Sequence, residues 1–201
     1  MKLAEMTWRE VADLAKEEIV AVVPVASCEQ HSYHLPFFTD SLLITAIVER
    51  VEEEMRDDIL LLPTQWLGVS QHHIAFGAIT VSERVHMDML VSIINSLLSM
   101  GFRKVLVVNG HGGNRNSVRC AIREVYQQHP DCLLAAADYW DVAMNVIAKL
   151  LEGPRRSIGH SDEIETSLML SLYPKLVRKD AIDDDDFAPP PALKAVYLPV
   201  D

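Results

Sequence analysis

The chain has 201 residues, 49% of them hydrophobic, and this length and composition predict one well-buried domain over residues 1–201. The formal net charge of −11, from 18 basic and 29 acidic residues, argues against a nucleic-acid partner. No apolar stretch approaches the roughly 20 residues that span a bilayer, and the three cysteines have no paired spacing, so we expect a soluble, cytoplasmic protein without membrane contact.

The first half of the chain alternates between helical and extended patterns. Thr7 followed by Glu10 is a capping box, which predicts a helix over residues 7–18. The run IVAVVPVA, residues 19–26, is continuously apolar, as expected of a strand buried on both faces of a parallel sheet. The later elements of this half are a helix at 41–56 that Asp40 opens, a strand at 59–67 and a short strand at 78–82.

The second half continues this alternation, with a helix over residues 87–100 that Gly101 stops. The remaining expected elements are strands at 104–110 and 133–140, helices at 116–128, 141–151 and 161–172, and an irregular surface tail at 183–194. Strands alternating with helices of this length predict a single three-layer α/β/α domain with a mainly parallel sheet. In such a sheet the ligand crevice lies beyond the carboxyl ends of the strands.

Metal-capable side chains follow the first predicted strand. The segment SCEQHSYHLPFFTD, residues 27–40, contains Glu29, His31 and Asp40. Alternate residues of an extended segment share a face, so Glu29 and His31 lie about 6.5 to 7 Å apart and each suits one of two neighbouring ions. Asp40 then either bridges the two ions or is simply the N-cap of the helix that follows.

Two further polar clusters lie at a strand end and a helix start. His111, in NGHGGN, is flanked by glycines that let the backbone approach a ligand, although it also suits a turn histidine. The stretch GHSDEIETS adds His160, Asp162, Glu163 and Glu165, for which the plain alternative is a capped, acidic first turn. Together with residues 27–40, these clusters favour a metal site.

The ligand types narrow the choice of metal. Imidazole and carboxylate groups without a committed cysteine suit Zn²⁺, Mn²⁺ or Fe²⁺. Two histidines and three carboxylates suffice for two ions about 3.5–4 Å apart, which share a carboxylate and a water and lower the pKa of that water. We therefore expect two divalent ions per chain, with Zn²⁺ as the first choice.

Four motifs resemble, in order, those of the creatininase (creatinine amidohydrolase) family. They are EQHSYHLP at 29–36, TD at 39–40, NGHGGN at 109–114 and HSDEIETS at 160–167, within a resemblance that spans residues 20 to about 173. The resemblance implies a creatininase-like fold and a binuclear metal amidohydrolase. Such an enzyme cleaves a non-peptide C–N bond of a small molecule, often a cyclic amide, and usually assembles as a hexamer.

The resemblance also implies roles for individual residues. The metal ligands would be Glu29, His31, Asp40, His111 and Glu165, with Asp40 bridging the two ions. His160 would be the catalytic proton shuttle, which protonates the leaving nitrogen while a hydroxide shared by the ions attacks the carbonyl.

The chain departs from the family pattern at several positions. Ser32 and Tyr33 replace a Gly-Pro pair, and AFGA at 75–78, after His72 and His73, replaces a Phe-Pro-Gly-Thr loop. Gly113 stands where creatininase proper has an acidic ligand, so Glu165 would supply the carboxylate of the second ion, and we do not expect creatinine as the substrate.

Relatives with the Gly-Gly version include a formamide deformylase and a peptidase that matures a redox peptide, and either activity is an alternative here. The chain ends at Asp201, earlier than most relatives, so we expect part of a pocket wall or subunit contact to be missing or to come from a neighbouring subunit.

Two other hypotheses compete with a metal-dependent hydrolase. One is an amidase that uses Cys28 as nucleophile, and the other is a non-catalytic, metal-binding assembly subunit. Cys28 more simply packs as a small apolar residue, and Trp140 suits the core or a pocket wall. His34 either orients a metal ligand or caps its loop. His86 and His129 are predicted to lie on helix surfaces.

Overall fold

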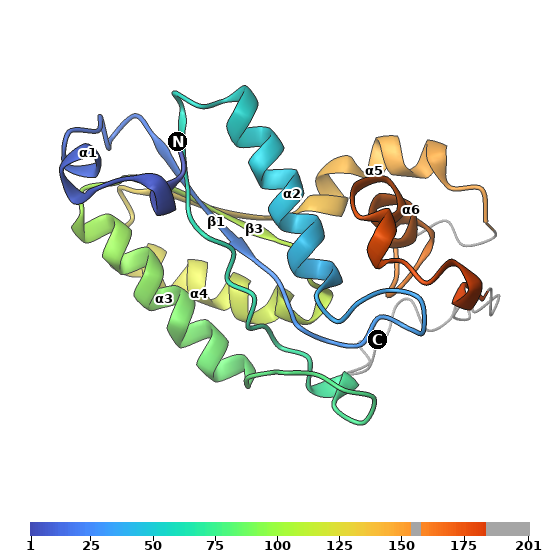
Figure 1. Ribbon diagram of the computed structural model, residues 1–201. Helices are drawn as coiled ribbons and strands as arrows, with labels where there is room; N and C mark the ends of the chain where they lie inside the picture. Colours follow the sequence, from blue (N-terminus) through green and yellow to red (C-terminus); the bar gives the residue numbers. More distant parts are fainter. Residues whose placement is uncertain (154–157, 184–201) are drawn as a thin grey trace.

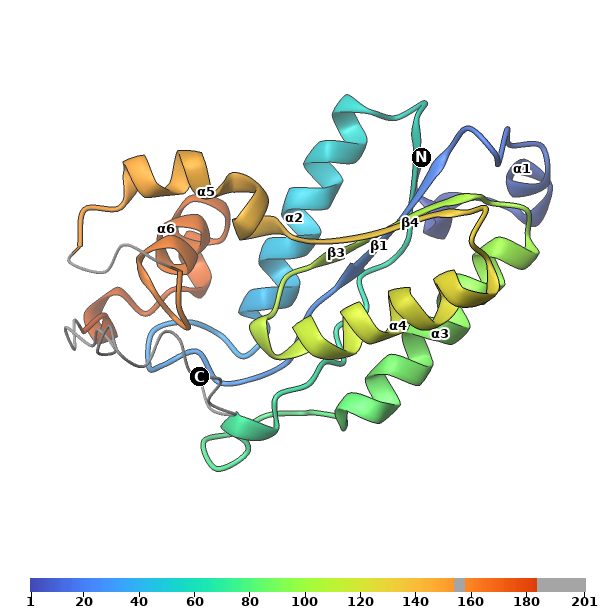
Figure 2. The ribbon, with the colours of Figure 1, turned by 180° about the vertical axis from the view of Figure 1, so that it is seen from behind.

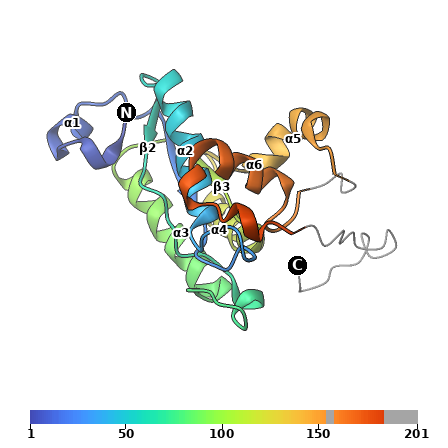
Figure 3. The same ribbon diagram turned by 45° about the vertical axis from the view of Figure 1, so that its right-hand side comes forward.

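A four-stranded sheet organises the computed structural model, which describes residues 1–153 and 158–183. The strand order is β2-β1-β3-β4 and every pairing is parallel. The strands are β1 (Val20–Val25), β2 (Ile59–Leu61), β3 (Lys104–Asn109) and β4 (Leu133–Asp138). This arrangement confirms the predicted α/β class with a parallel sheet, and Figure 3 brings β2 into view at one edge. The expected surface tail beyond residue 183 lies outside the described residues.

Each face of the sheet is covered by its own helical layer (Figures 1 and 2). Ala21, Val23 and Val25 of β1 join one apolar cluster, with residues of α3 (Glu83–Ser99) and α4 (Arg115–Gln128). Val22 of the same strand joins a second cluster, on the opposite face. The helices of that second layer are α2 (Thr39–Glu54), α5 (Tyr139–Leu150) and α6 (Glu163–Leu172). Because successive side chains of a strand point to opposite faces, a strand covered on both faces is apolar without alternation, as predicted.

The helix boundaries follow recognisable local signals. Ser82 caps α3 by accepting the Val85 N–H, and Gly101, with φ of +104°, follows the end of that helix. Asp162 caps α6 by accepting the N–H groups of Ile164 and Glu165.

The short 3-10 turns are η1 (Leu3–Glu5), η2 (Gln71–His73), η3 (Gly112–Asn114), η4 (Pro174–Leu176) and η5 (Lys179–Ala181). Among the described residues, no helix combines the length and apolarity needed to cross a membrane.

The first predicted helix is much shorter than expected. The capping box is present, since Thr7 accepts the Glu10 N–H and the Glu10 carboxylate accepts the Thr7 N–H. However, α1 covers only Trp8–Ala12 and buries none of its residues. A capping box stabilises a helix start, but continuation to residue 18 requires a well-buried apolar face, and Val11 and Leu14 are only partly buried against the core.

Two strand predictions also need correction. The strand expected over 59–67 ends at Leu61, just before Pro63, whose missing N–H cannot extend a ladder. Residues 78–82 form no strand and contribute only an isolated bridge between Ala78 and Glu29. The backbone there bonds to two different segments, Ile79 to Cys28 and Val81 to Gly68, so neither pairing extends into a sheet.

His86, expected on the surface of its helix, is instead fully buried between α3 and α4. Its Nδ1 lies 2.8 Å from the Ser117 hydroxyl oxygen, and its Nε2 has no hydrogen-bond partner among the described residues. Burial lowers the pKa of His86 from 6.5 to about 4. The folded protein therefore holds this imidazole neutral.

Acidification should consequently destabilise the fold through His86. Between pH 7 and pH 5 the unfolded chain gains a proton at His86 while the folded chain does not, which costs about 2 kcal/mol of stability. His86→Gln cannot titrate, so we expect its unfolding free energy to fall by about 2 kcal/mol less than that of wild type over this range. Urea denaturation at both pH values measures the difference, and equal losses would contradict the prediction.

Candidate metal centre

The polar segments meet at the carboxyl edge of the sheet, where β1 and β3 lie side by side. Val25 at the end of β1 pairs with Asn109 at the end of β3, and the Gly110 N–H donates to the Val25 carbonyl. A Cβ on Gly110 would lie 2.7 Å from Cβ of Ile44 on α2, so only glycine permits this approach. The segments that carry Glu29, Asp40 and His111 are thereby held against one another.

Asp40 lies in the first turn of α2 and points into the centre. Its Oδ1 is 2.9 Å from His31 Nε2, and its Oδ2 is 3.0 Å from His111 Nδ1 and accepts a bond from the Ser27 hydroxyl. The helix begins at Thr39, and its N-cap residue, Phe38, provides no side-chain cap. Asp40 is therefore not the helix N-cap, and its two oxygens face two different histidines.

Backbone carbonyls set the orientation of both histidines. His31 Nδ1 lies 3.1 Å from the Glu29 carbonyl oxygen, and His111 Nε2 lies 2.9 Å from that of Val69. A carbonyl can only accept, so these nitrogens carry the hydrogens in the neutral rings. The opposite nitrogens, His31 Nε2 and His111 Nδ1, then present lone pairs toward the carboxylates, as metal-binding histidines do.

Glu29 is fully buried among imidazole side chains. Neither carboxylate oxygen accepts a hydrogen bond of ordinary geometry from the described residues. Its Oε1 lies 3.4 Å from Nδ1 of His111 and 3.4 Å from Nδ1 of His160. Burying a carboxylate in this way is costly unless a cation balances it, so the residues present fit a metal ion.

Glu165 completes the predicted set from the first turn of α6. Its Oε2 accepts the Ser161 N–H at 2.6 Å and lies 3.7 Å from His31 Nε2. The ligand atoms fall into two groups, in each of which they lie within 4.8 Å of one another; the groups are Glu29, Asp40, His111 and His31, Asp40, Glu165. The structure thus brings all five predicted ligands together, and their binding of metal stays a prediction.

The electrostatics of the centre also call for positive charge. Burial alone would raise the pKa of Asp40, but the His31 charge and the His111 bond hold it well below its ordinary value. Burial would lower the pKa values of His31 and His111, yet Asp40 raises them to about 10 and about 9. Burial raises the pKa of Glu165 to about 8. These carboxylates stabilise positive charge on the buried imidazoles when no metal is present. Divalent ions could supply that positive charge in place of the protons.

His160 lies at the outer side of this centre, with its side chain 27% exposed. The side-chain oxygen Oε1 of Gln30 accepts the Ser32 N–H. Its side-chain nitrogen Nε2 is thereby directed toward Nε2 of His160 at 3.0 Å and Nδ1 of His73 at 3.1 Å. Burial and the charges on His31 and His73 lower the pKa of His160 to about 3, so the ring is neutral. The Gln30 amide nitrogen donates to Nε2, so the neutral ring carries its hydrogen on Nδ1, the nitrogen nearest Glu29.

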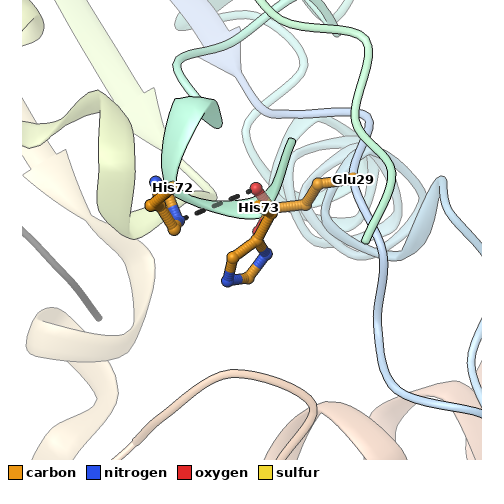
Figure 4. A group of neighbouring side chains, drawn as sticks. All are labelled: Glu29, His72 and His73. Carbon is orange, nitrogen blue, oxygen red and sulfur yellow. Dashed lines mark ion pairs between the residues drawn. The ribbon is translucent and has the colours of Figure 1, made fainter. Parts of the chain in front are cut away.

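His72 and His73 are the residues that sequence reasoning passed over. They lie on η2 beside Glu29, and the three residues offer ligand atoms within 4.8 Å of one another (Figure 4). Two adjacent histidines after a polar turn were a sequence signal for a functional site. No local pattern predicted that they would lie next to Glu29, which precedes His72 by 43 residues. Gln30 was also missed, because its role depends on side chains from distant segments.

The remaining candidates have structural roles. Burial raises the pKa of the Cys28 thiol, which disfavours the thiolate that a cysteine nucleophile needs. Trp140 belongs to the second apolar cluster. His34 Nε2 lies 2.8 Å from the Thr166 hydroxyl oxygen, which ties its loop to α6. Glu163 accepts the N–H groups of Glu152 and Gly153. Asp162 caps α6, and Glu163 and Glu165 make its first turn acidic, as the plain alternative expected; Glu165 also points its carboxylate toward His31.

Comparison with known proteins identifies similar chains. The family model for creatininase, described as creatinine amidohydrolase, matches residues 4–200. Creatinine amidohydrolase of Pseudomonas putida is 32% identical over 219 residues, which cover 99% of this chain and 81% of the relative. A 3-dehydro-scyllo-inosose hydrolase of Thermotoga maritima is 28% identical, and the alignment covers 90% of this chain. A mycofactocin precursor peptide peptidase of Mycobacterium ulcerans is also 28% identical, and the alignment covers 84% of this chain. The chain spans only 59% and 64% of the lengths of these last two relatives.

Solved structures agree with these matches. A crystal structure of creatinine amidohydrolase superposes with a TM-score of 0.84 at 30% identity, covering 100% of this chain and 82% of the other. A creatininase described with Mn and a mutant creatininase of Zn-Zn type have TM-scores of 0.80 and 0.76, each at 28% identity. Each alignment covers 100% of this chain and 82% of the other chain.

Proposed function

Because the chain belongs to the creatininase family, it is a hydrolase, and we propose that it cleaves a carbon–nitrogen bond of a small amide with two divalent metal ions. One observation carries the proposal: two groups of potential ligands share Asp40, whose oxygens face His31 on one side and His111 on the other. A carboxylate placed in this way can bridge two ions about 3.5–4 Å apart, the spacing of two-metal catalytic sites.

Glu29, Asp40 and His111 would hold one ion, and His31, Asp40 and Glu165 the other. When bound, two such ions polarise a carbonyl and lower the pKa of a shared water to near neutrality. The ligand types suit Zn²⁺ first, with Mn²⁺ or Fe²⁺ as alternatives. The forms of related creatininases with Mn and with Zn-Zn support a divalent metal here.

His160 would move the proton. Its Nδ1 faces Glu29, so it is the nitrogen on the side of the reacting atoms, while Gln30 holds the ring from Nε2. We infer that His160 donates the hydrogen on Nδ1 to the leaving nitrogen and that the ring regains a proton originating from the attacking water, so that no proton is gained or lost overall. Asp40 and Glu29 would remain ligands of the ions throughout.

A peptide is the second candidate substrate. The peptidase of Mycobacterium ulcerans supports it, as do the large apolar side chains that the loops beside the centre expose, Tyr33 at 87% and Phe76 at 79%. These loops touch each other, since the Gln30 N–H donates to the Gly77 carbonyl. An extended apolar substrate would cover such side chains. Parallel assays of cyclic amides, formamides and short peptides distinguish the candidates.

Metal removal tests the proposed function directly. We expect elemental analysis of the purified protein to give about two divalent ions per chain, and dialysis against a chelator to abolish hydrolysis of any substrate that the assays identify. Adding Zn²⁺ or Mn²⁺ back should restore the rate. Fewer than one ion per chain after growth in metal-supplemented medium, or hydrolysis that survives chelation, would contradict the proposal.

We further infer a cytoplasmic homo-oligomer. Val142, Val146 and Leu150 lie four residues apart on α5 and are 76%, 60% and 64% exposed, which suits burial against another subunit. The three cysteines are unpaired, as expected in a reducing compartment. Light scattering on the purified protein measures the assembly, and a monomer at micromolar concentration would rule it out.

A further inference from the structure

Gln30 lies between two histidines that come from different parts of the chain. Its side-chain nitrogen Nε2 is 3.0 Å from Nε2 of His160 and 3.1 Å from Nδ1 of His73. Its side-chain oxygen Oε1 accepts the Ser32 N–H at 2.9 Å. Because a backbone N–H can only donate, this bond fixes which end of the amide is oxygen and which is nitrogen. The amide nitrogen therefore faces both rings.

The Gln30 amide has one hydrogen for each ring. An amide nitrogen of this kind carries two hydrogens and donates both. The facing atoms, Nε2 of His160 and Nδ1 of His73, must then each present a lone pair, which a protonated imidazole lacks on both nitrogens. In the two neutral rings the hydrogen therefore lies on Nδ1 of His160 and on Nε2 of His73. A single side chain thus sets the tautomers of both histidines.

The residue that orients Gln30 has an unfavourable backbone conformation. Ser32 has φ of +56°, in the left-handed region that a Cβ disfavours. Among the described residues, only Ser32 and Ser161 combine a side chain with a positive φ. The Ser161 N–H donates to the Glu165 carboxylate, so each of these serines directs a polar side chain at the centre. Because such strain concentrates at functional sites, it supports a functional role for the bond to Gln30.

We propose that Gln30 is a positioning residue that keeps the hydrogen of His160 on Nδ1, the nitrogen that faces the centre. Nδ1 lies 3.4 Å from Glu29 Oε1, whereas Nε2 lies on the side of Gln30. The inference rests on the proposed function, in which this hydrogen passes to the leaving nitrogen and the ring regains a proton from the attacking water. With its hydrogen on Nε2, the ring would have none to donate there. The wrong tautomer of a catalytic histidine costs a serine protease about 10⁴ in kcat.

Nitrogen NMR of the isotope-labelled full chain, with Zn²⁺ added, reads the tautomer directly. In wild type we expect a protonated Nδ1 and an unprotonated Nε2 for His160, with the signals assigned by their loss in His160→Ala. Gln30→Met keeps the length of the side chain but removes the donor, so the His160 ring should populate both tautomers. Gln30→Glu can only accept, so at least one of His160 Nε2 and His73 Nδ1 should carry a hydrogen. Gln71→Met, a matched change at an exposed glutamine of η2, should leave the His160 signals unchanged.

Kinetics on a substrate that the assays identify test whether Gln30 acts through His160. We expect Gln30→Met to lower kcat about 10- to 100-fold with little change in KM, the usual effect of removing a group that orients a functional side chain. If Gln30 acts through His160, adding Gln30→Met to His160→Ala should lower kcat no further.

Either measurement is able to overturn the proposal. A wild-type His160 with its hydrogen on Nε2, or a tautomer that neither Gln30 substitution changes, would overturn it. Losses in kcat that multiply in the double variant would also overturn it, since Gln30 would then act independently of His160. A wild-type chain that binds no divalent ion would overturn the proposed function instead, because the tautomer is measured without turnover. Circular dichroism checks that each variant is folded.

Discussion

Asp40→Asn is expected to release both metal ions and to reduce hydrolysis by more than about a thousandfold. The substitution keeps the shape of the side chain but removes the charge that both ligand groups share. Metal ions supply several kcal/mol of transition-state stabilisation, and each 1.36 kcal/mol corresponds to a factor of ten in rate. Elemental analysis and steady-state kinetics on the same preparation measure both effects.

The matched controls for Asp40 are two carboxylates of α6. Glu165 lies near His31, so Glu165→Gln should lose one ion, whereas Glu163 binds the N–H groups of Glu152 and Gly153, so Glu163→Gln should keep both. If Asp40→Asn retained two ions per chain, Asp40 would not be the shared ligand.

His160→Ala should separate catalysis from metal binding. We expect kcat to fall by about 10²- to 10⁴-fold, the usual contribution of a positioned proton-transfer group, with little change in KM. The chain should still bind two ions, because both ligand groups that share Asp40 are complete without His160. Kinetics combined with metal analysis of the variant tests this prediction.

Two results would count against this role for His160. Loss of an ion in His160→Ala would make it a ligand, which its distance of 3.4 Å from Glu29 also allows. Loss of turnover in Cys28→Ala would support the cysteine-dependent alternative. We expect Cys28→Ala to remain active, because the Cys28 thiol is buried and its pKa is raised.

The sheet was predictable because its central strands are long apolar runs. Residues 19–26 and 104–110 contain β1 and β3 in full, since burial on both faces requires an uninterrupted apolar sequence. The segments that failed were those whose structure depends on partners elsewhere. Residues 78–82 have strand composition, yet their backbone bonds to two separate segments. The helix predicted over residues 7–18 ends at Ala12 because its apolar side chains are only partly buried.

The sequence by itself determined the family, the edge of the sheet where the centre lies, and the five residues that meet there. The resemblance to the family supplied the five residues, and the edge followed because strand ends in a parallel sheet share one edge. Only the tertiary structure decided which oxygen of Asp40 faces which histidine, and that Gln30 contacts His160 and His73. It also placed His72 beside Glu29. These contacts join residues from separate segments, and their geometry is set by packing of the layers, which no local pattern encodes.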